Sequence, residues 1–262
     1  VVPYVPGEQP QNKVIKLNTN ENPYPPAPGV ERVLREMDTD RFRLYPDPAA
    51  EELTGCLAEY YGVDQDQVFV GVGSDDVLAL AFLTFFNSGK PILFPDITYS
   101  FYDVWAELFQ IPYERPALDD AFALRLEDYQ CENGGIVIAN PNAPTGIRQS
   151  EEFLRAVIEA NPNVVVIIDE AYADFSGYTA LPLVDEYENV VVVQTFSKSR
   201  SMAGMRIGHA IGNAKLIKAM NDVRYSFNSY PMTRLSVALG VAALSDQDYF
   251  EETTAKIVAT RE

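Results

Sequence analysis

A lysine and an aspartate each follow an apolar run of this chain, and together they could perform chemistry on a carbonyl group. Lys198 stands between two serines in TFSKSR, shortly after the apolar residues 190–193. An amine near cationic neighbours and away from bulk water has a lowered pKa and can form a Schiff base with an aldehyde. Arg200 and Arg206, which follow Lys198, favour this interpretation.

Asp169 ends the apolar run VVVIID, where an unpaired carboxylate would be costly. We therefore expect a cationic partner for it. A pyridinium nitrogen is one candidate, because a buried aspartate keeps such a ring protonated and makes it an electron sink. Tyr172 could donate a hydrogen bond to a phenolate oxygen of the same ring, and Tyr99 in PDITYS has the flat side chain that stacks on a heteroaromatic ring.

Another set of residues could bind a phosphate dianion. Arg206 offers a fork-shaped cation, and Thr195 and Ser197 offer hydroxyl groups. GVGSDD places Ser74 and Asp75 at a predicted junction of strand and helix, where backbone N–H groups bind anions. Each of these short motifs alone is common in turns, helix caps and solvated surfaces. Taken together, the lysine, aspartate, tyrosines and phosphate-binding groups indicate pyridoxal phosphate.

The elements that must position these residues can be predicted from hydrophobic periodicity. Short runs rich in β-branched residues predict strands at 68–72, 91–94, 135–139, 164–168 and 190–193, with one more in RIGHAIG. Helices are predicted at 75–86, 101–109 and 151–159, and others from about 213 and 231. Strands that are apolar on both faces and alternate with helices indicate an α/β fold with a mostly parallel sheet covered on both sides. Ligands of such sheets bind at the carboxyl ends of the strands, where the motifs above lie.

The composition limits the class of protein. The 262 residues are 47% hydrophobic and carry a formal net charge of -18, as in a soluble globular chain. This acidic balance argues against nucleic-acid and anionic-membrane partners, and no stretch reaches the ~20 apolar residues of a membrane span. We expect a cytoplasmic protein. His209 is the only histidine, which argues against a histidine-based metal site, and the absence of GxGxxG after the first strand argues against a dinucleotide-binding dehydrogenase.

The order of the motifs LNTNENPYPP, YPDP, GVGSDD, NPNAPTG, IDEAY and TFSKSRSMAGMRIG resembles that of fold-type I pyridoxal-phosphate aminotransferases, and in detail that of the histidinol-phosphate aminotransferase family. The resemblance implies an enzyme of histidine biosynthesis that moves an amino group between histidinol phosphate and 2-oxoglutarate. Related activities stay open: an aromatic aminotransferase, a threonine-phosphate decarboxylase, or a non-catalytic fragment that binds pyridoxal phosphate.

The same resemblance implies a role for each candidate residue. Lys198 would form the Schiff base and move the proton, and Asp169 would pair with the pyridine nitrogen. Tyr172 would bond the phenolic oxygen and Tyr99 would stack on the ring. The phosphate would be bound by Ser74, Asp75 through its backbone, Thr195, Ser197 and Arg206. Tyr45 would reach the phosphate of the neighbouring subunit in a homodimer. Asn20, Glu21 and Tyr24 would lie near the substrate.

The chain departs from the family pattern at Ala143, where these enzymes commonly have the asparagine that bonds the phenolic oxygen. Losing such a charge-assisted hydrogen bond would cost about 1.5–3 kcal/mol. We expect Asn142 to replace it, ahead of Asn140 from the same loop.

Three segments are predicted on the same basis. Residues 1–44 would form an N-terminal arm and a small-domain segment, and residues 45–245 the large cofactor-binding domain. Residues 246–262 would begin a C-terminal small domain whose remainder, with the arginine that grips the substrate carboxylate, lies beyond Glu262.

Overall fold

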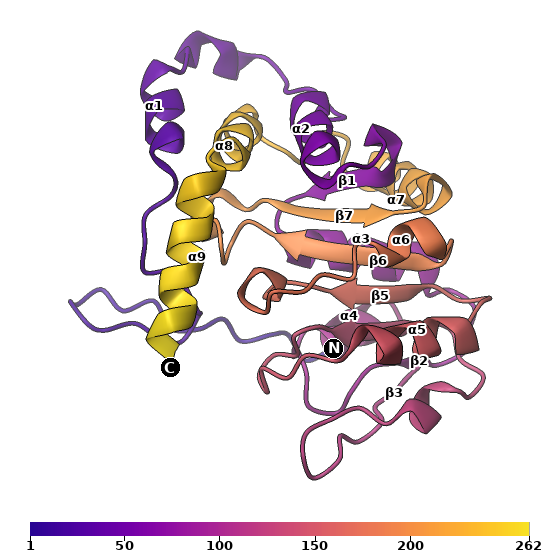
Figure 1. Ribbon diagram of the computed structural model, residues 1–262. Coiled ribbons are helices and arrows are strands. Elements are labelled where there is room, and N and C mark those ends of the chain that lie inside the picture. Colours follow the sequence, from indigo (N-terminus) through magenta and orange to yellow (C-terminus); the bar gives the residue numbers. More distant parts are fainter. Residues whose placement is uncertain (262) are drawn as a thin grey trace.

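A computed structural model describes residues 1–261, and these residues fold around a seven-stranded sheet (Figure 1). The strands lie in the order β1-β7-β6-β5-β4-β2-β3. β7 is antiparallel to both of its neighbours, whereas β6, β5, β4, β2 and β3 are parallel to one another. Their bounds are β1 Val68–Gly71, β2 Ile92–Leu93, β3 Tyr113–Glu114, β4 Ile136–Ala139, β5 Val166–Asp169, β6 Val190–Thr195 and β7 Gly208–Gly212.

Helices cover both faces of the sheet, as the alternating pattern predicts. α2, α5, α6 and α8 lie on one face, and α3, α4 and α7 on the other. The helices run over α1 Pro28–Glu36, α2 Glu51–Tyr61, α3 Ser74–Phe85, α4 Tyr102–Leu108, α5 Glu151–Ala160, α6 Leu183–Glu186, α7 Ala214–Phe227, α8 Arg234–Leu244 and α9 Gln247–Arg261. The predicted mostly parallel α/β sheet sandwiched by helices is confirmed.

The core consists of two layers because successive residues of a strand point to opposite faces. In β5, Val166 and Ile168 pack into one layer and Ile167 into the other, and all three side chains are fully buried. Burying such side chains contributes about 1.5–3 kcal/mol each. The carboxyl ends of β4, β5 and β6 are thereby fixed side by side, with Asp169 opposite Ala139 and Val193.

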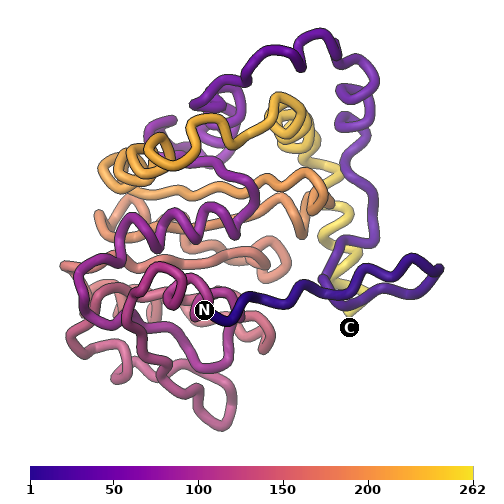
Figure 2. Tube along the Cα trace, turned by 180° about the vertical axis from the view of Figure 1, so that it is seen from behind, coloured from indigo at the N-terminus to yellow at the C-terminus, as the bar shows by residue number. Residues whose placement is uncertain are grey.

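Residues 1–27, called the arm from here on, contain no regular helix or strand. Figure 2 shows the arm, in indigo, extending away from the body as a loop and returning past the end of α9. α1 begins at Pro28, because a proline in the first turn suits a helix. The division of the chain at residues 44 and 245 stays a prediction.

Candidate active site

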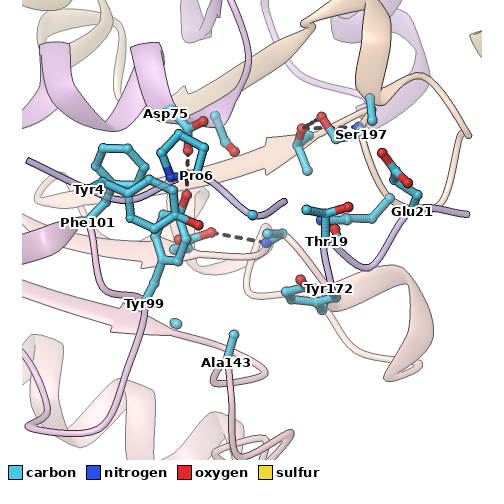
Figure 3. Close-up of a pocket in the computed structure, with 18 of the residues that line it drawn as sticks. Tyr4, Pro6, Thr19, Glu21, Asp75, Tyr99, Phe101, Ala143, Tyr172 and Ser197 are labelled. Carbon is cyan, nitrogen blue, oxygen red and sulfur yellow. Dashed lines mark hydrogen bonds between the residues drawn. The ribbon is translucent and has the colours of Figure 1, made fainter. Parts of the chain in front are cut away.

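A cavity of about 560 Å³ opens at the carboxyl ends of the parallel strands. Its walls come from the arm, the N-terminus of α3, and the loops that follow β2, β4, β5 and β6 (Figure 3). Residues far apart in the sequence therefore meet here, as the motif positions predict. The predicted residues that line this cavity are Lys198, Asp169, Tyr172, Tyr99, Ser74, Asp75, Thr195, Ser197, Arg206 and Glu21.

Asp169 presents a buried carboxylate to this cavity without a protein cation beside it. Its Oδ2 accepts a hydrogen bond from Tyr102 Oη at 2.6 Å, and its Oδ1 accepts one from the backbone N–H of Ala171 at 3.1 Å. No lysine or arginine of residues 1–261 lies within 4.0 Å of it. Burial raises the pKa of Asp169 to about 6, against the effect of these two donors. A cationic ligand nitrogen would satisfy this carboxylate.

Lys198 is held by contacts between its loop and the arm. Its Nζ donates a hydrogen bond to the backbone oxygen of Thr19 at 2.8 Å and lies 5.6 Å from the centre of the Tyr172 ring. Asn22 Nδ2 donates to the backbone oxygens of Lys198 and Ser199, at 2.8 and 3.2 Å. The amine that could react and the loop that carries it are therefore both bound to residues 19–22 of the arm.

The turn before α3 approaches β7 too closely for any side chain between them. A Cβ atom added to Gly208 would lie closer than 3.0 Å to the backbone of Gly73 and Ser74. Gly73 itself has a φ of 86°, in the left-handed region that favours glycine, and it precedes the first helical residue, Ser74. Ser74 and Asp75, the first residues of α3, line the cavity, and the N–H groups in the first turn of a helix suit an anion.

Arg206 adds a cation beside this helix end. Its Nη2 lies 3.1 Å from Asp75 Oδ2, and Tyr99 Oη donates to Asp75 Oδ1 at 2.9 Å. Thr195 Oγ1 donates to Ser197 Oγ at 3.0 Å. Because a guanidinium carries five N–H donors, Arg206 can bind an anion while it keeps its bond to Asp75.

These features fit pyridoxal phosphate. Asp169 matches a protonatable ring nitrogen, and Lys198 supplies a primary amine to the same cavity. Ser74 and Asp75, at the start of α3, line that cavity beside Arg206, where they could bind an anion. Tyr99 lines the wall beside them, together with the stacked rings of Tyr4 and Phe101.

Asn142, predicted to replace the missing donor at Ala143, bonds instead within its own loop and to the loop after β2. Its oxygen accepts a hydrogen bond from Thr98, and its amide donates to Ile97 and Thr145. Asn142 does not line the cavity of Lys198, whereas Ala143 does. It lines a neighbouring pocket of about 430 Å³ instead, so its polar atoms are not directed at the ring site.

The other predicted residues lie around the cavity. Asn20 lines the neighbouring pocket, and its Nδ2 donates to Tyr172 Oη at 2.9 Å. The Tyr24 ring lies 5.8 Å from Lys256 Nζ of α9. The side chain of Tyr45 is 79% exposed and its ring lies 4.8 Å from that of Tyr230. Within this chain, Tyr24 and Tyr45 do not line the cavity.

The sequence reasoning missed residues that complete the site. Tyr102 donates a hydrogen bond to Asp169. Thr19 and Asn22 bind Lys198, which lies in the loop after β6, called the lysine loop. Tyr4 and Phe101 stack with ring centres 4.3 Å apart. Tyr102 is the first residue of α4, and its ring packs edge-on against that of Tyr99, with ring centres 5.7 Å apart.

Two classes of feature are absent from the part of the chain that the structure describes. Residues 1–261 hold no cluster of three or more histidine, cysteine, aspartate or glutamate side chains that could bind a metal ion. In the same residues, no helix combines the length and apolar character needed to cross a membrane.

Comparison with known proteins identifies the family. Residues 12–262 match the sequence model of aminotransferase class I and II. The chain belongs to this family. Among the relatives of this aminotransferase is the "Histidinol-phosphate aminotransferase" of Chromohalobacter salexigens, which is 54% identical over the whole chain and 75% covered by it. Another, of the same name from Clostridium beijerinckii, is 52% identical and 74% covered.

A solved structure supports the fold of this aminotransferase. The crystal structure of histidinol-phosphate aminotransferase from Sinorhizobium meliloti "in complex with pyridoxal-5'-phosphate" superposes with a TM-score of 0.84 at 26% sequence identity, over 93% of this chain and 67% of that one. The resemblance predicted from the motifs is thereby confirmed for the family and for the fold.

Proposed function

We propose that this aminotransferase moves an amino group between histidinol phosphate and 2-oxoglutarate, with pyridoxal phosphate as cofactor, as a cytoplasmic step of histidine biosynthesis. The observation that carries the proposal is the joint presence, in one cavity, of Lys198, the unpaired carboxylate of Asp169 and the anion site at the start of α3. The relatives named histidinol-phosphate aminotransferase support the choice of substrate.

When bound, pyridoxal phosphate supplies an aldehyde that condenses with amines and a ring that accepts an electron pair. Lys198 Nζ would bind the aldehyde carbon and move a proton at the amine-bearing carbon of the substrate. Asp169 would accept the ring N–H. Tyr99 would cover one face of the ring. The phosphate would be held by Ser74, the backbone of Asp75, Thr195, Ser197 and Arg206.

Tyr172 is the donor that we assign to the phenolic oxygen in place of the residue missing at Ala143. Its Oη already accepts a hydrogen bond from Asn20 Nδ2 at 2.9 Å. The hydroxyl proton is therefore free to be donated into the cavity that Tyr172 and Ala143 both line. Asn20 would thus act on the cofactor through Tyr172, in addition to its proposed position near the substrate.

The substrate would enter beside the arm. Glu21 lines the cavity, and its hydrogen bond from Lys16 lowers the pKa of its carboxyl group, so it stays ionised near neutral pH. An anionic Glu21 attracts the cationic groups of an amine substrate. Tyr24 lies farther along the arm, where its ring faces Lys256 of α9, and it would border the substrate there.

We also propose a homodimer in which Tyr45 reaches the cofactor phosphate of the partner. Tyr45 is 79% exposed, and its ring lies 4.8 Å from the ring of Tyr230, which is also exposed, as is the neighbouring Leu44. Exposed apolar side chains that lie together are typical of an interface. The variant Tyr45→Phe should stay dimeric by light scattering and lose cofactor affinity. A monomeric wild-type chain would contradict the proposal.

The cofactor assignment can be tested by spectroscopy. Purified protein with added pyridoxal phosphate should develop a visible absorption band that borohydride abolishes, and peptide mapping should place the reduced cofactor on Lys198. Lys198→Arg should give neither band nor adduct, whereas Lys16→Arg, which changes a lysine of the arm, should give both. An adduct on another lysine would sink the assignment.

Substrate choice needs a separate assay. Amino transfer from histidinol phosphate to 2-oxoglutarate should exceed transfer from aromatic amino acids, and threonine phosphate should not be decarboxylated. If unreduced protein that develops the visible band shows no transfer from histidinol phosphate, the cofactor assignment survives and the substrate assignment fails.

A further inference from the structure

Tyr102 is buried behind the cavity and makes the shortest contact of the Asp169 carboxylate. It belongs to α4, its side chain is fully buried, and it is not among the residues that line the cavity. Its hydroxyl donates to Asp169 Oδ2 at 2.6 Å, whereas the other oxygen accepts the longer bond from Ala171. One face of the carboxylate is thus fixed by the protein and the other faces the cavity.

The charged and titratable groups around Asp169 make this contact important. Asp75 of α3 repels the ionised carboxylate, and Tyr99 and Tyr102 face it from the chain around the start of α4. Lys198, after β6, lines the same cavity but forms no ion pair with Asp169 within residues 1–261. Burial and Asp75 therefore favour the neutral acid, and the two hydrogen-bond donors favour the carboxylate.

We propose that Tyr102 is a positioning residue that keeps Asp169 ionised and turned toward the cavity. The inference rests on the proposed function in one respect: the ionised oxygen is the partner of a protonated ring nitrogen. A phenol can donate to a carboxylate only while it keeps its proton, and burial raises the pKa of Tyr102 well above its ordinary value, so it remains a donor at every pH of interest. The neutral acid would offer the ring nitrogen a much weaker partner.

The chain offers a matched control for the loss of a buried tyrosine hydroxyl. Tyr129, like Tyr102, is fully buried, but its hydroxyl has no hydrogen-bond partner within residues 1–261. Tyr102→Phe and Tyr129→Phe remove the same atom from buried sites of similar size. Any effect of cavity or packing is shared, and only Tyr102→Phe removes a donor from Asp169.

The first experiment uses the chain without cofactor. In Tyr102→Phe the pKa of Asp169, followed by carbon-13 NMR of labelled aspartate with Asp169→Asn for assignment, should rise by about one to two units. The sign for stability follows: an acid whose pKa is raised on folding stabilises at low pH and loses that contribution as pH rises through its folded pKa. Tyr102→Phe should therefore lose stability between pH 6 and 8 relative to Tyr129→Phe. Identical pKa values in the two variants would overturn the inference.

The second experiment measures cofactor binding at pH 6.5. Tyr102→Phe should bind pyridoxal phosphate at least about tenfold more weakly than wild type, and Tyr129→Phe should bind like wild type. If the pKa moves as stated but wild type binds no cofactor, the proposed function fails and the role of Tyr102 toward Asp169 stands. If wild type binds cofactor on Lys198 and the two variants match each other in both experiments, the proposed function stands and the role of Tyr102 fails.

Discussion

Replacing Gly208 by alanine tests whether the backbone of β7 and the turn before α3 together form the anion site. The added Cβ would lie closer than 3.0 Å to backbone atoms of Gly73 and Ser74, where an ordinary contact is 3.4–4 Å. The two segments must therefore separate by at least 0.4 Å, and no flexible side chain can yield instead. Overpacking of this kind costs about 1–3 kcal/mol, and for a chain of this size each kcal/mol lowers Tm by about 2–4 °C.

The same displacement moves the N–H of Ser74, which we assign to the cofactor phosphate. A hydrogen bond to a charged group contributes about 1.5–3 kcal/mol, so Gly208→Ala should raise the Kd of pyridoxal phosphate at least about tenfold. Equilibrium titration at constant pH measures the Kd, and calorimetry measures Tm. Gly204→Ala is the control, since a Cβ there meets nothing within 4 Å. The reasoning is refuted if both variants match wild type, and a lower Tm with unchanged Kd would remove Ser74 from the phosphate site.

Two further predictions concern Asn22, which binds the loop of Lys198, and the buried His209 of β7. Asn22→Ala removes both hydrogen bonds to the backbone of Lys198 and Ser199, so we expect cofactor attachment to slow about tenfold in stopped-flow absorbance. The control is Asn18→Ala, which changes an exposed arm residue whose side chain bonds the backbone of Glu8 and should react like wild type. Equal rates for the two variants would count against a role for Asn22. Burial lowers the pKa of His209 to about 3, so the unfolded chain gains a proton that the folded chain does not, and stability should fall as pH drops from 6.5 toward 3. Urea unfolding should show a smaller acid loss in His209→Gln, and an unchanged loss would mean that other groups cause it.

The sheet and the residues at its carboxyl edge could be predicted from the sequence because both follow from local pattern. Strands buried on both faces are continuous apolar runs. Asp169 is the last residue of one of them, β5, and Lys198 lies in the loop that follows another, β6. Parallel pairing then brings the two strand ends to the same edge without further information.

Contacts that join distant segments through side chains could not be predicted in this way. Asn22 and Thr19 reach the lysine loop from the arm, and nothing in their spacing indicates the partner. Asn142 shows the opposite limit: its residue type suited the ring site, but Thr98, Ile97 and Thr145 already engage its polar atoms. An amide bonds whichever donors and acceptors packing provides, so its type alone does not fix its direction.

The antiparallel strand β7 has a consequence for the order in which the molecule can assemble. β1 pairs with no strand of residues 1–261 other than β7, and Gly71 lies opposite Gly208. The turn that carries Ser74 is therefore held in place only after a very long loop has closed, which makes this a slow, non-local event. A nascent or partly folded chain can contain Lys198 and Asp169 side by side and still lack its anion site. A chain that retains its cofactor would then be one that has completed folding. A chain in which β7 has not been inserted between β1 and β6 would not retain it.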